Sequence, residues 1–318
     1  MNSLFMLLLL SLFAGALYLG GPKAPRTMTS ISAPFKNVDF SDLPPIQTIT
    51  AREGSELTYR RYPTQQALQG SIVLVHGSSA SSSSMHPLAE TLRDQGWQVI
   101  AVDIRGRGGS GERGKARYVG QLEHDLEDVL QALTLPRPLL LTGFSSGGGF
   151  VLRMAGGKPQ AMFDGFLLLA PFLGQDAPTF RPDAGGWVSV GVPRYVGLAI
   201  LNALGLRAFN DLPVNRFAID PTSTEPLTAS YNFALADNFR PEQDWLATIQ
   251  RTRLPLHVIV GENDEAFIAS EFEAAFAAGG RAGVVTHVPG IGHTSLTVEP
   301  AAPAAIVSAA GVLRAQHR

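Results

Sequence analysis

The chain has 318 residues, enough for one large domain or two small ones. Its 25 Lys and Arg against 27 Asp and Glu give a net charge of −2, which excludes a strong electrostatic attraction to nucleic acid. The 45% of hydrophobic and 16% of charged residues exclude a disordered chain, and the absence of cysteine excludes disulfide frameworks, thiolate zinc sites and cysteine nucleophiles.

The N-terminal segment, residues 1–22, carries no charged side chain and is almost continuously apolar over residues 4–19. That length lies between the apolar part of a signal peptide and a full membrane span. The first basic residues, Lys23 and Arg26, follow the segment, which favours a retained transmembrane anchor over a cleaved signal. We therefore expect a chain that is membrane-associated through residues 4–20, or exported if the segment is cleaved; a helix buried in the domain is the alternative.

Residues 23–45 are rich in Pro, Ser and Thr without periodicity and are expected to form a linker or surface arm. From residue 46 onward, apolar runs rich in β-branched residues alternate with apolar residues at helical spacing. Strands are expected at residues 57–62, 71–75, 97–102, 139–142, 165–170, 256–260 and 284–288. Helices are expected at residues 85–95, 118–133, 146–155, 272–278 and 301–313. This alternation is typical of the α/β class, with a mostly parallel central sheet and helices on both faces.

One stretch, residues 171–253, interrupts the alternation and is far longer than an ordinary crossover needs. Its apolar run at residues 187–206 contains Arg194 and several Gly and Pro residues, which argue against a membrane span. We expect an inserted, mostly helical cap over the sheet; helices packed on the flank of the sheet are the alternative. The expected limits are an N-terminal segment at 1–22, a linker at 23–45, a core at 46–170 and 254–318, and a cap at 171–253.

The sequence Gly-Phe-Ser-Ser-Gly at residues 143–147 matches the pattern G-x-S-x-G. An expected strand precedes it and an expected helix follows, so a sharp turn would lift the Ser145 hydroxyl above the sheet. The N-terminus of the following helix favours negative charge in front of the serine. These features indicate a nucleophilic serine; a tight turn with an incidental serine is the alternative.

A serine nucleophile needs a base, and the chain has seven histidines. His293 lies in a glycine-flanked loop directly after the last expected strand, where a base can reach over the edge of the sheet. The other six lie on expected strands (His257, His287), on expected helices (His86, His124), at a turn (His76) and near the C-terminus (His317). His293 is therefore the candidate base.

The base needs an acid, and three carboxylates follow the expected strand at residues 256–260. Asp264 is the best candidate, with Glu262 and Glu265 as alternatives. Backbone N–H groups must also receive the oxyanion. We expect them from Ser146, directly after the nucleophile, and from Ser78, which Gly77 allows to turn toward the same point.

The run Ser78–Ser84 is otherwise expected to be a flexible polar loop. A basic run lies further along the chain, at Arg105, Arg107, Arg113, Lys115 and Arg117. It is expected to be a solvated loop, with contact to anionic lipid headgroups as the alternative.

The G-x-S-x-G motif, the His76-Gly77 turn and the stretch Asp-Ile-Arg-Gly-Arg-Gly-Gly-Ser at residues 103–110 together resemble the serine α/β-hydrolase superfamily. The chain order Ser145, Asp264, His293 is also that of this superfamily. The likeness is greatest to the branch of monoacylglycerol lipases, lysophospholipases and S33-type serine aminopeptidases. It spans residues 71–171 and 254–313 and leaves out the cap. The family often has His where this chain has Arg107, a change in a turn that leaves the candidate triad untouched.

The resemblance implies an α/β-hydrolase fold and two-step acyl transfer through an acyl-enzyme on Ser145, with no metal or organic cofactor. Dehalogenase and epoxide hydrolase chemistries, which use a carboxylate nucleophile, are disfavoured. Apolar cap residues suggest an acyl pocket: Phe172, Trp187, Val190, Leu198 and Leu201. The expected substrate is a small-molecule ester or lipid of monoacylglycerol or lysolipid type, although cap helices are also apolar for packing alone. The oligomeric state is not indicated.

Two other functions stay open. An S33-type aminopeptidase would need acidic groups in the cap to bind a free α-amino group, and the candidates there are Asp176, Asp183, Asp211 and Glu225. A non-catalytic binding protein on the hydrolase scaffold is the third hypothesis, because such proteins can keep the triad.

Overall fold

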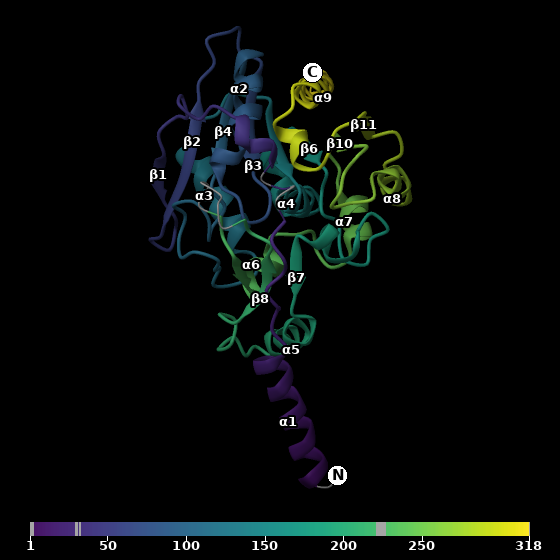
Figure 1. Cartoon of the computed structure of the whole chain (residues 1–318). Coiled ribbons are helices and arrows are strands. Elements are labelled where there is room, and N and C mark those ends of the chain that lie inside the picture. The colour runs from purple at the N-terminus through teal and green to yellow at the C-terminus, as the bar shows by residue number, and fades with distance from the viewer. Residues whose placement is uncertain (1–2, 29–30, 32, 221–226, 318) are drawn as a thin grey trace.

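The computed structural model describes residues 3–28, 31, 33–220 and 227–317. Its centre is an eight-stranded sheet with the order β1-β2-β4-β3-β5-β6-β10-β11 (Figure 1). The strands are β1 (Gln47–Thr50), β2 (Glu56–Tyr62), β3 (Gly70–Val75), β4 (Trp97–Val102), β5 (Leu139–Phe144), β6 (Gly165–Leu169), β10 (Leu256–Gly261) and β11 (Val285–Val288). β1 and β2 run antiparallel to their neighbours, and the other strands are parallel. The expected α/β architecture is confirmed.

The three middle strands, β3, β5 and β6, are buried along their whole length. Their continuous apolar sequences are typical of parallel strands covered on both faces. The covering helices are α2 (His86–Asp94), α3 (Gln121–Ala132), α4 (Ser146–Gly156), α8 (Phe272–Ala278) and α9 (Ala301–Gln316). α2 and α9 pack against each other, whereas α4 packs on β5 and β6 with α7 (Trp245–Arg251) beside it. The sheet is therefore a rigid base for the loops that follow its parallel strands.

The insertion between β6 and β10 contains helices, as expected, and also a small antiparallel sheet. Its helices are α5 (Val192–Ala203), α6 (Phe233–Asn238) and α7, and its strands are β7 (Val188–Val190), β8 (Pro213–Phe217) and β9 (Ser230–Asn232). Figure 1 shows α5, α6, β7 and β8 of this unit between the main sheet and α1, whereas α7 lies beside α4 and α8. The prediction missed the three strands because each has only three to five residues and no clear alternation.

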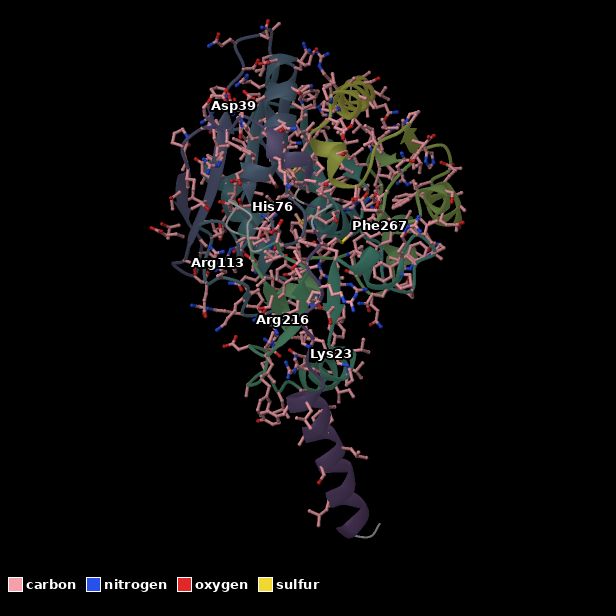
Figure 2. All side chains as sticks on the ribbon, viewed as in Figure 1. Lys23, Asp39, His76, Arg113, Arg216 and Phe267 are labelled. Atoms are coloured by element: carbon pink, nitrogen blue, oxygen red, sulfur yellow. The ribbon has the colours of Figure 1, made fainter. Side chains whose placement is uncertain are left out.

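Helix α1 (Ser3–Leu19) extends away from the rest of the protein and packs at its C-terminal end against α5 (Figures 1 and 2). Arg194 of α5 caps it, because its guanidinium donates to the carbonyl oxygens of Leu17 at 2.6 Å and Tyr18 at 2.9 Å. Within the described parts of the chain, no helix has both the length and the apolar character required to cross a bilayer. The expected transmembrane anchor is thus not supported.

Candidate active site

Ser145 lies in a sharp turn between β5 and α4. Its φ angle is 56°, in a region that non-glycine residues rarely adopt, and its N–H donates to the Leu169 carbonyl of β6 at 2.8 Å. The flanking glycines make room for this turn. A Cβ on Gly143 would lie 2.3 Å from the Gly147 carbonyl oxygen, and one on Gly147 would lie 2.3 Å from that of His76. Both glycines of the motif are therefore required by contact with backbone atoms.

Three residues from three different strand ends form a hydrogen-bonded chain. Ser145 follows β5, Asp264 follows β10 and His293 follows β11. The Ser145 Oγ is 3.0 Å from His293 Nε2, and His293 Nδ1 is 2.7 Å from Asp264 Oδ2. All three residues are buried, with exposed fractions of 7%, 3% and 5%. The structure thus brings together the nucleophile, acid and base predicted from the sequence.

The environment of His293 favours its protonated form. Burial by itself would lower the pKa of the imidazole, but the charge and hydrogen bond of Asp264, together with the charge of Glu265, outweigh it and raise the pKa. The imidazole also packs against the rings of Phe144 and Phe267, with centroids 4.7 and 5.0 Å away. These contacts hold the ring in one orientation between serine and aspartate.

The three carboxylates after β10 have different positions. Asp264 Oδ1 accepts from the backbone N–H groups of Ala266 and Phe267 at 2.9 and 2.8 Å, which leaves Oδ2 for the imidazole. Glu265 instead accepts from the backbone N–H of His293 at 2.8 Å, and Glu262 is exposed. Of the three, Asp264 therefore has the contacts expected of the candidate acid, whereas Glu265 holds the main chain of the candidate base, a contact that the sequence did not indicate.

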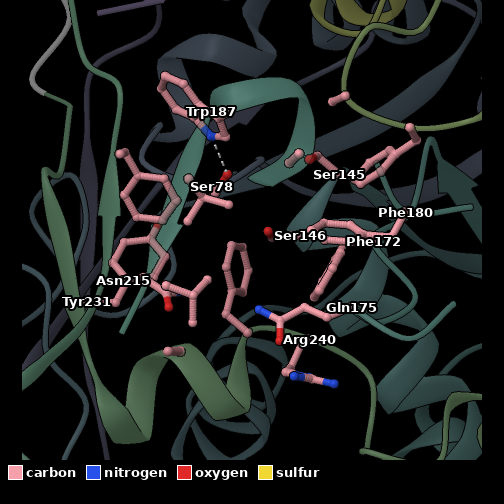
Figure 3. A pocket seen from close by; sticks show the side chains of 18 of the residues that line it. Ser78, Ser145, Ser146, Phe172, Gln175, Phe180, Trp187, Asn215, Tyr231 and Arg240 are labelled. Atoms are coloured by element: carbon pink, nitrogen blue, oxygen red, sulfur yellow. Dashed lines mark hydrogen bonds between the residues drawn. The ribbon is translucent and has the colours of Figure 1, made fainter. Parts of the chain in front are cut away.

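The expected oxyanion donors, Ser146 and Ser78, both lie close to the candidate nucleophile. Ser146 is the first residue of α4, so its N–H is among those without an acceptor inside the helix. Ser78 follows β3, and both residues line the same cavity as Ser145 (Figure 3). The Ser78 hydroxyl accepts a hydrogen bond of 2.9 Å from the Trp187 indole. This bond, absent from the sequence-based prediction, ties the cap to the candidate oxyanion loop.

His76 has a structural role at the start of that loop. It is fully buried, its Nδ1 donates to the Gly77 carbonyl at 2.8 Å, and its Nε2 accepts from the Ile104 N–H at 3.2 Å. The ring in this arrangement is neutral, because each nitrogen has one partner of the required kind. Burial, helped by the nearby charge of Arg107, lowers its pKa to about 4.

Two expected surface loops are packed in the interior. Ser81–Ser84 are buried, and the Ser82 N–H donates to Asp103 at 2.6 Å, so this run is no exposed polar loop.

The basic run begins with two buried residues. Arg105 makes a bidentate ion pair with Asp125 at 2.6 and 2.7 Å.

Arg107 is held in a different way from Arg105. Its guanidinium lies 4.1 Å from the ring centroid of Tyr231 and 4.3 Å from that of Phe239. It thus connects the turn after β4 to β9 and to the end of α6, both in the cap. The prediction of a solvated loop holds only for the exposed Arg113 and Arg117 of the run.

Two cavities meet at Ser145. The first, the cap-side cavity, has about 70 Å³ and is lined by Ser145, Ser146 and cap residues that include Phe172, Trp187 and Val190. Its charged lining residue is Arg240, which lies across the cavity from Trp187 in Figure 3. Leu198 and Leu201, also expected in an acyl pocket, are buried in α5 and line neither cavity.

The second cavity, the arm-side cavity, has about 340 Å³ and reaches Ser145 and His293 from the side of residues 31–40. Both cavities are mainly apolar around the serine. Ser145 thus borders two separate spaces of different size.

Within the described residues, one cluster of side chains could hold a metal ion, namely Asp42, His86 and Glu90. Its closest pairs are His86 Nε2 with Asp42 Oδ1 at 3.1 Å and with Glu90 Oε2 at 3.4 Å. The cluster lies outside the candidate triad. It joins residues 31–45 to α2.

The sheet order, the strained turn at Ser145 and the Ser–His–Asp chain define the α/β-hydrolase fold class. A family model for the serine aminopeptidases S33 matches residues 66–300, so the chain belongs to that family. The resemblance inferred from the sequence is confirmed.

Several solved structures share the fold at low sequence identity. A soluble variant of monoglyceride lipase from Saccharomyces cerevisiae has a TM-score of 0.64 at 19% identity, over 90% of this chain and 98% of that one. The monoacylglycerol lipase of Paleococcus ferrophilus has a TM-score of 0.60 at 19% identity, over 82% and 99%. A membrane phospholipase A, described as a bacterial virulence factor, has a TM-score of 0.59 at 18% identity, over 98% of both chains.

Proposed function

We propose that this α/β hydrolase cleaves carboxylic esters of lipid-like substrates, of monoacylglycerol or lysolipid type, through an acyl-enzyme on Ser145. The observation that carries the proposal is the hydrogen-bonded chain from Ser145 through His293 to Asp264, which opens on mainly apolar cavities. Two of the structural neighbours are a monoglyceride lipase and a monoacylglycerol lipase, which favours the same substrate class.

The first half of the reaction acylates the serine. Ser145 Oγ bonds to the ester carbonyl carbon while its proton moves to His293 Nε2, and Asp264 stabilises the imidazolium. The amides of Ser78 and Ser146 receive the oxyanion. Collapse of the tetrahedral intermediate breaks the bond to the alcohol oxygen, which takes the proton from Nε2.

The second half releases the acid. A water molecule gives its proton to Nε2 and its oxygen bonds to the acyl carbon. The second tetrahedral intermediate expels Ser145, which recovers the proton. After the reaction, Ser145, His293 and Asp264 are again in their starting protonation states.

The experiment is hydrolysis of p-nitrophenyl esters by the full chain and by Ser145→Ala, together with labelling by a fluorophosphonate. We expect turnover and labelling by the parent protein and at least a thousandfold lower turnover without labelling in the variant. A folded parent protein that is neither labelled nor active would exclude serine hydrolysis and favour a non-catalytic binding protein.

An aminopeptidase activity is the second candidate. Of the four carboxylates expected to bind an amine, Asp176 and Asp211 line neither cavity, and the Asp183 side chain and Glu225 lie outside the described residues. A different carboxylate, Asp220, lines the arm-side cavity and could face a free α-amino group. Turnover of aminoacyl p-nitroanilides above that of the esters would favour this activity.

We also propose that the N-terminal end associates with lipid bilayers. Exposed apolar side chains gather on α1 and α5, namely Met6, Leu7, Leu12, Val192, Val196 and Ile200. Such a surface is costly in water and favours an apolar phase. One structural neighbour is a membrane phospholipase A.

Sedimentation with phosphatidylcholine vesicles tests this association. We expect the full chain to sediment and a chain without residues 1–22 to stay in solution while it keeps its fluorophosphonate labelling. Equal sedimentation of the two chains with the vesicles contradicts the proposal.

A further inference from the structure

The arm-side cavity has a wall that does not belong to the hydrolase core. Four half-buried apolar side chains from the arm, defined here as residues 31 and 33–45, line it: Ile31, Phe35, Val38 and Phe40. The same cavity is also lined by Phe144, Ser145 and His293. The N-terminal arm therefore covers the reaction centre instead of acting only as a linker.

Trp187 is common to the arm-side cavity and the cap-side cavity. It lines both, as do Ser78, Ser145 and His293. Its indole is fixed by the hydrogen bond to the Ser78 hydroxyl, and its carbonyl accepts from the Ala218 N–H at 2.9 Å. A substrate bound at Ser145 thus meets a fixed indole that borders two spaces of unequal size.

The arm is attached on both sides of the cavity. Before the arm, the Met28 N–H donates to the Ala218 carbonyl at 3.1 Å, so this end is tied to the same residue as Trp187. At the other end, the Asp42 carboxylate is 3.1 Å from His86 Nε2, and Phe40 lies against the His86 ring. Figure 2 places Lys23, which precedes the arm, near the α5 end of the domain, and Asp39 of the arm toward the opposite end.

From this geometry we infer that the arm-side cavity holds the hydrocarbon chain of the ester, and that the arm sets the selectivity for chain length. An apolar cavity of about 150 Å³ admits benzene, so 340 Å³ has room for a flexible chain, whereas 70 Å³ does not. Each methylene that enters an apolar cavity improves binding about fourfold. This inference rests on the proposed ester hydrolysis and adds the subsite.

Binding to an inactive protein tests the subsite without turnover. The probe is methyl decanoate, titrated by calorimetry into Ser145→Ala and into the same protein with Val38→Trp, which fills the cavity from the arm. We expect the added tryptophan to weaken binding at least tenfold. Ile46→Trp is the matched control, because Ile46 lies just beyond the arm, is 49% exposed and lines neither cavity.

Kinetics of the active protein show which part of the ester carries the chain. One series consists of p-nitrophenyl esters of increasing acyl length and the other of acetates of increasing alcohol length. For each series, the measured quantity is the kcat/KM of the long ester divided by that of the short ester. In Val38→Trp, we expect this ratio to fall at least tenfold in one of the two series. Ile46→Trp should keep the parent ratio.

Two results overturn the inference: equal binding of methyl decanoate with and without Val38→Trp, or unchanged length profiles in both series. Phe35→Ala is the second variant if Val38→Trp does not fold, and it should weaken binding at least threefold through lost contacts. Failure of the proposed function gives a different pattern, in which Ser145-dependent turnover is absent although the probe still binds and the arm variant still weakens it.

Discussion

The Glu265 carboxylate accepts a hydrogen bond from the backbone N–H of His293 at 2.8 Å, while the preceding residue, Asp264, holds the ring of the same histidine. Two consecutive acidic residues therefore fix the candidate base, one through its main chain and one through its imidazole. Both negative charges also raise the pKa of His293.

Glu265→Gln tests the charge in this arrangement. The base must be neutral, so kcat/KM falls below the pKa of His293, which lies above its ordinary value of 6.5. The amide keeps an acceptor oxygen but removes the charge, and the acid limb of the pH profile should move to lower pH. Glu265→Ala loses the acceptor as well and should lower kcat about tenfold. An acid limb that does not move in Glu265→Gln contradicts the electrostatic role.

Local patterns predicted the nucleophile turn and the order of the triad, because each rests on a few neighbouring residues. The assignment of the acid needed the structure, since Glu262, Asp264 and Glu265 are adjacent and only their side-chain directions separate them. The interpretation of Arg107 failed for a related reason. Its aromatic partners are Tyr231 and Phe239, more than 120 residues away in the chain, and no local pattern reveals such a contact.

The arm is a second case in which the sequence does not reveal a long-range contact. Residues 31–45 have the composition of a linker, yet Phe35 and Val38 form part of a wall around the reaction centre. Composition indicates only how a segment behaves by itself. The position of the arm depends on hydrogen bonds to His86 and to Ala218, which lie far along the chain.

Asp264→Asn tests the assignment of the acid. The asparagine keeps the size of the side chain but loses the charge that stabilises the imidazolium and selects the tautomer of His293. We expect kcat for a p-nitrophenyl ester to fall about 10⁴-fold. Glu262→Gln is the matched control and should leave kcat within twofold, because Glu262 is exposed and lies outside both cavities. A larger loss of kcat in Glu262→Gln than in Asp264→Asn would identify Glu262 as the acid instead.

His76 should make the stability depend on pH. The unfolded chain binds a proton on this residue near the ordinary pKa of 6.5, and the folded protein does so only near 4. Between these values the unfolded state holds more protons, so the free energy of unfolding falls as the pH falls, by about 1.4 kcal/mol per pH unit from this group.

Urea unfolding at several pH values between 6.5 and 4 measures this slope. His76→Gln should reduce the slope by about that amount while it lowers stability at pH 7, because a ring with two hydrogen bonds is lost. The assignment to His76 is wrong if its variant shows the parent pH dependence.

Gly147→Ala tests the steric origin of the serine turn. The new Cβ would lie 2.3 Å from the His76 carbonyl oxygen and 2.7 Å from that of Val75, and neither backbone atom can move without displacing β3. We expect a loss of about 3 kcal/mol or more in the free energy of unfolding, together with loss of fluorophosphonate labelling at Ser145. Gly311→Ala in α9 is the matched control: its Cβ meets open space, and alanine is favoured over glycine in a helix, so stability should rise by about 0.5–1 kcal/mol. If Gly147→Ala is as stable and as readily labelled as the parent, the close approach of α4 to the His76 loop does not determine the position of the nucleophile.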